Sequence, residues 1–247
     1  MFDVERKERI IEILKEHGSC SVAKLSRLLN FSEATIRRDL NALDKEMKIT
    51  KTFGGAVIRE SYGNEVPTFV RKSENVDVKR SLARACARYI KDNMTVFLCA
   101  STTVEQIVPY ILGRTGLTVI TNSPDIPKML ANTEINVYST GGKYLHHSNS
   151  YVGEFARQFI EKVNADLVVF SPRGVSNKGK ITNSSTEDDV ILAMIKNSKK
   201  ACVLFDATKL DKTYPFTVCN LSDVDVIISN TDLAGDITGN AEVVKVD

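Results

Sequence analysis

The sequence predicts an α/β protein of two unequal units: a small, mainly helical N-terminal unit and a larger unit around a mostly parallel sheet. Two observations support this prediction. Over residues 1–58, three segments with helical spacing of apolar residues precede a short hairpin signal. From Thr95 onward, short continuous apolar runs alternate with helix-like segments, a pattern typical of a parallel sheet covered on both faces.

Composition and charge are those of an ordinary globular protein. The 247 residues are 43% hydrophobic and 26% charged, with a net charge of +2, so a nucleic-acid-binding surface must come from local charge arrangement. Five scattered cysteines without a CxxC pair indicate reduced thiols. Apolar runs fall far short of the roughly 20 residues that span a membrane. We expect a soluble cytoplasmic protein with no membrane segment, metal or cofactor.

The N-terminal unit is predicted to contain three helices and a hairpin. The first helix ends near Gly18, which suits a left-handed C-terminal position. Ser21 is placed to cap a short second helix, and Ser32 to cap a third. Gly54-Gly55 then signals a tight turn between two strands.

A linker is expected between the two units. Residues 59–75 have no clear period and contain Gly63 and Pro67. The predicted organisation is therefore a mainly helical unit at 1–58, a linker at 59–75 and an α/β unit at 76–247.

The larger unit is predicted to begin with a helix at 76–90 and to continue as alternating strands and helices. The expected strands are residues 95–99, 117–121, 135–140, 165–170, 200–206 and 224–229. Helices are expected around 103–112, 125–131, 151–161 and 186–197. In such a sheet, ligands bind outside the carboxyl ends of the strands, so the loops that follow the strands are the candidate site.

The third predicted helix carries the first functional signal. With Ile36 at the centre of its apolar face, Leu40 and Leu43 lie within about 40° of it. The opposite face holds Ala34, Arg38, Asn41 and Lys45, flanked by Thr35 and Arg37. Arginine forks onto guanine or phosphate, and asparagine reads adenine. A solvated helix face explains the same pattern, so this helix alone leaves both interpretations open.

The surroundings of this helix favour DNA. Two helices joined by a short turn and followed by a Gly-Gly hairpin form a winged helix-turn-helix. Residues 8–57 resemble the DNA-binding domain of the DeoR family of bacterial transcriptional regulators. The family pattern is a Ser-rich turn, "TIRRDL" and a strand ending in "GGA", and all three occur here in order. Phe53 replaces a frequent histidine.

The resemblance implies contacts with double-stranded operator DNA. Together with the helix phase and the hairpin, it gives the expected DNA-binding residues: Ser32, Thr35, Arg37, Arg38, Asn41, Lys45 and Lys51. Asp39 also matches the motif, but it is expected to orient a neighbouring group because it would repel phosphate. Paired half-sites are usual for such proteins, so a homodimer or homotetramer is expected.

The resemblance continues over most of residues 76–230. It implies a sensor domain similar in fold to ribose-5-phosphate isomerase that binds a small anionic metabolite, a phosphorylated sugar or a relative of one. The expected effector-binding residues are Ser101, Thr102, Thr103, Asn122, Gly141, Gly142, Lys143, Arg173, Gly174 and Lys209. Consecutive hydroxyls at the start of a helix suit a phosphate. Simple capping, turn formation and surface solvation remain alternatives for these residues.

Two loops depart from the family pattern. Cys99 and Arg173 stand where the family usually has acidic residues that would hold sugar hydroxyls. Arg173 instead favours a more anionic ligand. The alternative is a pocket that no longer senses a metabolite.

An enzyme is the weaker hypothesis, and no catalytic residue is predicted. Isomerase chemistry needs a positioned carboxylate base. The acids at 187–189 open a helix, where acids are favoured anyway, and His146-His147 lack a partner at ligand spacing. We predict a transcriptional repressor whose operator affinity changes with effector binding. An isomerase-like enzyme with an appended DNA-binding domain is the alternative, as is a regulator with a non-sensing pocket.

Overall fold

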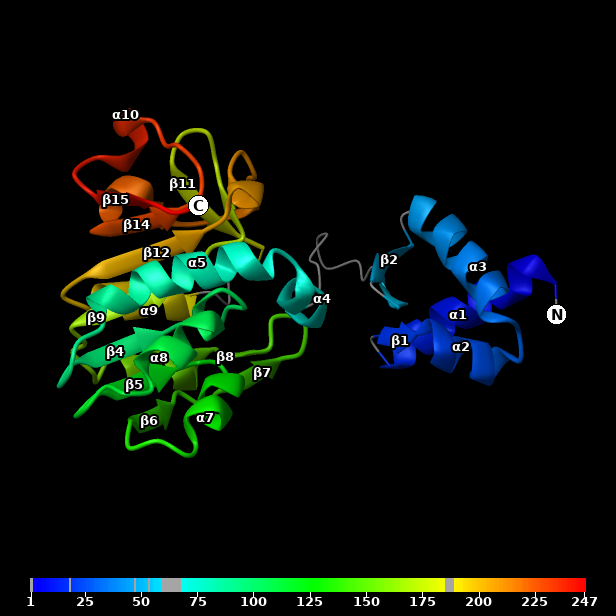
Figure 1. Cartoon of the computed structure of the whole chain (residues 1–247), viewed down its shortest axis with the longest axis horizontal. Helices are drawn as coiled ribbons and strands as arrows, with labels where there is room; N and C mark the ends of the chain where they lie inside the picture. The colour runs from blue at the N-terminus through cyan, green and yellow to red at the C-terminus, as the bar shows by residue number, and fades with distance from the viewer. Residues whose placement is uncertain (1, 18, 47, 53, 59–67, 185–188) are drawn as a thin grey trace. The chain divides into compact units, whose positions relative to one another are not determined.

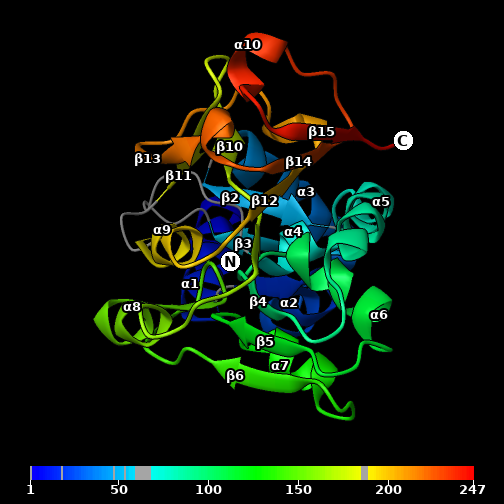
Figure 2. The same ribbon diagram turned by 90° about the vertical axis from the view of Figure 1, so that its left-hand side faces the viewer.

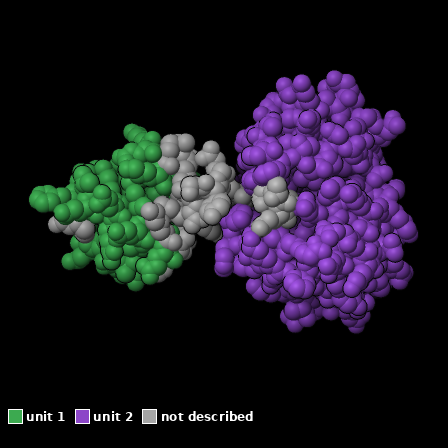
Figure 3. All heavy atoms as spheres, turned by 180° about the vertical axis from the view of Figure 1, so that it is seen from behind, with its two compact units in different colours: residues 1–71 green, residues 72–247 purple. Residues whose placement is uncertain are grey.

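The computed structural model describes residues 2–17, 19–46, 48–52, 54–58, 68–184 and 189–247. The chain divides into two compact units, Met1–Arg71 and Lys72–Asp247, which Figure 3 colours separately. The boundaries expected at 58/59 and 75/76 remain a prediction.

The first unit is a three-helix winged fold. It contains α1 (Asp3–His17), β1 (Ser19–Ser21), α2 (Val22–Leu29), α3 (Glu33–Lys45), β2 (Ile49–Thr52) and β3 (Gly55–Ile58). The three strands form one antiparallel sheet in the order β1-β3-β2. Its apolar core gathers one face of each helix, with Ile10, Leu25, Ile36, Leu40 and Leu43 almost fully buried. The predicted helices and hairpin are confirmed, whereas β1 was not predicted.

Local chemistry explains where these elements begin and turn. The Oγ atom of Ser21 accepts a hydrogen bond from the backbone N of Lys24 at 3.1 Å, so Ser21 caps α2 as expected. Gly54 has φ +91° in the tight turn of the hairpin. A side chain at Gly55 would lie 2.4 Å from the carbonyl oxygen of Cys20, so the pairing of β1 with β3 requires the second glycine. The C-terminal role expected for Gly18 lies outside the described residues.

The expected linker is partly helical. Helix α4 (Thr68–Ser73) occupies its second half, and residues 59–67 lie outside the described part of the chain. Six residues are too few to show a hydrophobic period, which is why the sequence pattern did not indicate this helix.

The second unit is built on a seven-stranded parallel sheet in the order β15-β14-β12-β9-β4-β5-β6 (Figure 1). The strands are β4 (Thr95–Leu98), β5 (Thr118–Thr121), β6 (Asn136–Ser139), β9 (Leu167–Phe170), β12 (Ala201–Phe205), β14 (Val226–Ser229) and β15 (Glu242–Lys245). The six predicted strands are confirmed. The prediction that residues 224–229 close the series is wrong, because β15 adds a parallel edge strand beside β14.

Helices cover both faces of this sheet. The helices are α5 (Val76–Cys86), α6 (Val108–Ile111), α7 (Asp125–Leu130), α8 (Glu154–Ile160), α9 (Asp189–Lys196) and α10 (Gly235–Thr238). Figure 2 shows α5 and α6 on one side of the strands and α8 and α9 on the other. Along β4, Val96 and Leu98 enter one core while Phe97 enters the other. This alternation explains the continuous apolar strands.

Two smaller features were not predicted. Strands β7 (Lys143–Leu145) and β8 (Ser150–Val152) form a hairpin, so the helix expected around 151–161 begins only at Glu154. Strands β10 (Gly174–Val175), β11 (Lys180–Asn183) and β13 (Phe216–Asn220) form a separate antiparallel sheet. No helix within the described residues is long and apolar enough to span a membrane.

The strand order contains a point where neighbouring loops diverge. From β4 the chain adds β5 and β6 on one side, then returns to place β9 and the later strands on the other. The loops after β4 and β9 therefore diverge from neighbouring strands at a topological switch point. In sheets of this kind, that crevice is the usual ligand site.

Candidate functional site

Helix α3 starts with a well-formed cap at the predicted position. The Oγ atom of Ser32 accepts a hydrogen bond from the backbone N of Thr35 at 3.2 Å and lies 2.9 Å from the Thr35 hydroxyl. Both predicted DNA-facing hydroxyls therefore serve first to fix the start of α3. The hydroxyl groups remain at the outer surface, because Ser32 is exposed and Thr35 is half-buried.

The outer face of α3 is cationic, as predicted. Arg37, Arg38, Asn41 and Lys45 are all exposed, while the apolar face is buried. Arg37 forms an ion pair with Glu33 at 2.7 Å, four residues earlier. Arg38 has no ion-pair partner among the residues that the structure describes. Of the two adjacent arginines, Arg37 therefore has to release a carboxylate before it can contact a phosphate or base, and Arg38 does not.

The hairpin extends this basic face. Lys51 lies on β2, and its backbone N donates to Oδ1 of Asp44 at 3.2 Å. Its Nζ donates to Oδ1 of Asn41 on α3. Asn41 must release that bond to pair with both polar positions of an adenine edge. A second lysine beside the hairpin, Lys48, forms an ion pair with Glu46 at 2.8 Å.

Asp39 is a structural residue on the opposite side of α3. It is 1% exposed, and its carboxylate accepts two hydrogen bonds from the guanidinium of Arg6 on α1, at 2.5 and 3.0 Å. Arg6 also lies 4.6 Å from the ring centroid of Phe31. The group that Asp39 orients is therefore the side chain of Arg6 on α1. Helical phase places Asp39 about 60° from Ile36, which is the signal that would have revealed its burial.

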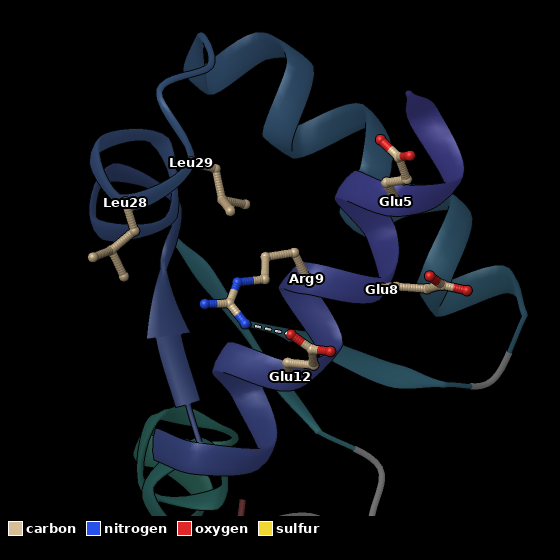
Figure 4. A pocket seen from close by; sticks show the side chains of 6 residues that line it. All are labelled: Glu5, Glu8, Arg9, Glu12, Leu28 and Leu29. Carbon is tan, nitrogen blue, oxygen red and sulfur yellow. Dashed lines mark hydrogen bonds and ion pairs between the residues drawn. The ribbon is translucent and has the colours of Figure 1, made fainter. Parts of the chain in front are cut away.

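A groove elsewhere in this unit has the wrong charge for DNA. It has a volume of about 370 Å³ and is lined by residues of α1 and α2: Glu5, Glu8, Arg9, Glu12, Leu28 and Leu29 (Figure 4). Its one arginine, Arg9, pairs with Glu12 at 2.5 Å. The remaining glutamates repel phosphate, so the basic face of α3 and β2 is the candidate DNA interface.

In the second unit, the loop after β4 buries its hydroxyls more deeply than expected. The Oγ atom of Ser101 accepts a hydrogen bond from the backbone N of Thr103 at 3.2 Å. Thr102 and Thr103 are buried, and within the described part of the chain the Thr103 hydroxyl has no hydrogen-bond partner. The helix expected at 103–112 is a 3₁₀ turn, η2 (Val104–Ile107), followed by the short α6. A long helix N-terminus therefore does not supply the expected phosphate-binding amides.

Asn122, after β5, holds two loops together. Its Oδ1 accepts from the backbone N of Ala100 at 2.7 Å, and its Nδ2 donates to the carbonyl oxygen of Tyr151 at 3.2 Å. Asn122 thus positions the loop after β4 against β8. Its expected contact with a sugar hydroxyl stays a prediction.

Gly141 and Gly142 follow β6 with φ angles of +61° and +110°. A side chain at Gly142 would lie 2.6 Å from the carbonyl oxygen of Val152, so this glycine lets the chain approach β8. The next residue, Lys143, begins β7 and is exposed. The close backbone approach that was expected at these glycines is therefore an approach to strand β8 of the same chain.

The loops after β9 and β12 bring two cations to the same edge of the sheet. The Nζ atom of Lys209 donates to Oγ of Ser171 at 2.6 Å, which joins the two loops. The backbone N of Arg173 is held by Oδ1 of Asn183 at 3.0 Å. A side chain at Gly174 would lie 2.4 Å from the carbonyl oxygen of Lys212. The predicted effector residues thus lie around the carboxyl ends of β4, β5, β6, β9 and β12, which we call the rim.

Sequence patterns missed a polar cluster beside the rim. It consists of Lys72, Glu105, Ser123, Asp125 and Asn149. Glu105 is almost buried, and this burial raises the pKa of its carboxyl despite the opposing charge of Lys72. The Lys72 ammonium lies 3.1 Å from Glu105 and 2.6 Å from Asp125. No periodic or spacing signal links these residues, which come from distant segments.

The side chains considered for metal binding or catalysis lie in different parts of the second unit. The described residues contain no group of three or more His, Cys, Asp or Glu side chains that could hold a metal ion. The thiol of Cys99 is 1% exposed and donates to the sulfur of Met194 at 3.2 Å, so it belongs to the core. His146 packs edge-on against Tyr144. Of the three acids at 187–189, only Asp189 lies within the described residues, where it begins α9.

Comparison with solved structures gives weak likenesses. Ribose 5-phosphate isomerase A from Methanocaldococcus jannaschii aligns with a TM-score of 0.42 at 15% identity, covering 56% of this chain and 55% of that chain. A likeness at this TM-score carries no inference about this chain.

Comparison with known sequences is decisive for the family. The DeoR-like helix-turn-helix domain matches residues 6–62, and the DeoR C terminal sensor domain matches residues 74–231. An uncharacterized HTH-type transcriptional regulator of Bacillus subtilis is 32% identical over 235 residues, covering 94% of this chain and 91% of that protein. The transcriptional repressor AccR of Agrobacterium fabrum is 30% identical over 230 residues, covering 92% and 89%. The chain therefore belongs to the DeoR family of transcriptional regulators.

Proposed function

We propose that this chain represses transcription by binding double-stranded operator DNA through α3 and the β2–β3 hairpin, as a homodimer or homotetramer. The observation that carries the proposal is the exposed basic face of a firmly capped α3, with Arg38 unpaired among the described residues and Lys51 beside it. Relatives named as repressors support the sign of regulation.

The operator contact is tested with Arg38→Ala in the full chain. Arg9→Ala is a matched control, because Arg9 is, like Arg38, an exposed arginine of the first unit but lines the acidic groove. DNA fragments flanking the gene are titrated at several salt concentrations, with fluorescence anisotropy as the readout. Loss of one phosphate contact lowers the slope of log K against log salt by about 1. If Arg38→Ala and Arg9→Ala bind equally, α3 is not the operator-reading helix.

We further propose that an anionic, phosphorylated metabolite binds at the rim and changes operator affinity. Buried hydroxyls at one end of the rim and the cations Arg173 and Lys209 at the other support a ligand with phosphate and a further anionic group. Calorimetry of the full chain against phosphorylated sugars and phosphorylated sugar acids tests this. Lys209→Met should weaken binding, whereas Lys162→Met, before β9 at the other edge of the sheet, should not. Absence of heat with every compound would indicate a pocket that senses nothing.

A further inference from the structure

Lys72 is the first residue of the second unit, and it is held by two carboxylates. It lies on α4, the helix that contains the boundary between the two units. Its Nζ lies 2.6 Å from Oδ2 of Asp125 and 3.1 Å from Oε2 of Glu105. The side chain of Glu105 is 7% exposed, whereas that of Lys72 is 40% exposed. The first residue of the second unit thus reaches a carboxylate buried in that unit.

The two carboxylates belong to rim loops. Glu105 lies two residues after Thr103, in the turn that follows β4. Asp125 begins α7, three residues after Asn122 in the loop that follows β5. The hydroxyl of Ser123 donates to Oε1 of Glu105 at 3.5 Å, so the two loops are also joined directly.

A third rim segment is attached to the same cluster. Asn149, in the turn between β7 and β8, donates from Nδ2 to Oδ2 of Asp125 at 2.8 Å. The same Oδ2 atom accepts from Lys72. The phenol of Tyr144 donates to Oδ1 of Asn149 at 2.7 Å, which ties β7 to the cluster. Two rim loops therefore contact one ammonium group directly, and the turn between β7 and β8 joins them through Asp125.

Electrostatics makes this arrangement sensitive to the rim. A buried carboxylate without a nearby cation is costly, and within the described residues Lys72 is the cation that Glu105 contacts. The attraction falls with distance, so a shift of the loop after β4 changes the hold of Glu105 on Lys72. Lys72 is partly in solvent and can exchange the carboxylate for water.

We propose that the cluster of Lys72, Glu105 and Asp125 couples the rim to the DNA-binding unit. An effector that contacts the loop of Ser101 to Thr103 displaces Glu105 and thereby changes how firmly α4 is held, which alters operator affinity. The inference rests on the proposed function, because it requires a rim that binds an effector and an α3 that binds an operator. Coupling between two sites is reciprocal, so operator DNA changes effector affinity by the same factor.

The test separates coupling from binding. Operator dissociation constants are measured for the full chain with and without a phosphorylated probe, chosen as the tightest binder among ribose 5-phosphate, the hexose 6-phosphates and 6-phosphogluconate. The unaltered chain should show a change of about 5- to 150-fold. Lys72→Met should still bind the probe and the operator, but the probe should change operator affinity less than about two-fold.

Lys128→Met is the matched control. Lys128 also pairs with Asp125, at 3.4 Å, but it lies on α7 and is 76% exposed. This variant should keep the full effect of the probe. Glu105→Gln serves as a second variant that removes the buried charge and leaves the lysine, and it should also lose the coupling. Hydrogen exchange of residues 68–73 should respond to the probe in the unaltered chain and in Lys128→Met only.

The outcomes are distinguishable. If Lys72→Met and Glu105→Gln retain the full effect of the probe, the cluster does not transmit it, although the proposed function stands. If no compound binds the unaltered chain, effector sensing fails and the coupling fails with it. If either variant loses probe binding itself, the cluster is part of the binding site and the inference is overturned.

Discussion

The buried pair of Arg6 and Asp39 allows a quantitative prediction for Asp39→Asn. The two residues are 6% and 1% exposed, and they join α1 to α3 through two hydrogen bonds. Removing the carboxylate leaves a guanidinium buried without its main partner, which typically costs about 3–5 kcal/mol. Asp3 still accepts from Arg6 at 2.9 Å and is half exposed, so we expect the lower end, about 3 kcal/mol.

Hydrogen exchange of the full chain is the appropriate assay. The chain has no tryptophan, so intrinsic fluorescence does not isolate the first unit. At about 1.4 kcal/mol per factor of ten, a loss of about 3 kcal/mol speeds exchange of the core amides of α3 by roughly 150-fold. Glu8→Gln, an exposed acid on α1, is the control and should change these rates little. Acceleration below about five-fold, which corresponds to less than about 1 kcal/mol, would refute the reasoning.

A paired replacement provides a second check. In Arg6→Met with Asp39→Leu, both buried charges become apolar side chains of similar size, and such exchanges are often neutral or stabilising. The double variant should therefore exchange more slowly than Asp39→Asn. Because Asp39 is buried away from the outer face of α3, Asp39→Asn should leave the operator dissociation constant of the folded protein within about two-fold.

Three further predictions concern the second unit. Gly142→Ala should lower the thermal midpoint more than Gly141→Ala. Only the side chain added at 142 meets a backbone oxygen, at 2.6 Å, and this clash should add about 1–3 kcal/mol of strain to the folded state. A hydrogen bond from Lys199 holds the pKa of Asp166 below its ordinary 3.8. The stability that this interaction contributes is therefore complete above pH 3.8, and it is lost as the pH falls through the lower pKa that Asp166 has in the folded state. Thermal midpoints of Lys199→Met and the unaltered chain should therefore converge at acidic pH; a constant difference would contradict this. Burial raises the pKa of Cys219 to about 12, so iodoacetamide at pH 8 should label it far more slowly in the folded chain than in the unfolded chain, as mass spectrometry of its peptide would show.

Elements set by local chemistry could be predicted from the sequence. Ser21 and Ser32 cap the helices that they were expected to cap, because capping depends on a side chain and the amides three residues away. The buried strands of the parallel sheet were found because both of their faces are apolar. Strand β1 could not be found this way, since its three residues are defined by pairing with β3 at the far end of the unit.

In the candidate sites, too, the features set by a local pattern were predictable and the individual side-chain contacts were not. The phase of α3 predicted its basic face, but the pairing of Arg37 with Glu33 and of Lys51 with Asn41 depends on side-chain geometry. The rim was predicted because strand order places loops at a common edge. Asn122 links two loops, and Lys72 contacts the carboxylates of two loops. Both arrangements require contacts between segments that no local pattern connects.

Burial separates the roles of the two carboxylates that these contacts revealed. Asp39 and Glu105 are both almost buried, and each pairs with a cation from a distant segment. The partner of Asp39 is buried too, so the pair opens only by leaving charge inside the protein, and it holds α1 on α3 as a fixed connection. The partner of Glu105 is 40% exposed, so water can replace the carboxylate at a lower cost. An ion pair with one exposed partner can therefore separate when a ligand binds nearby. For this reason we assign the coupling of effector binding to Lys72 and a structural role to Arg6.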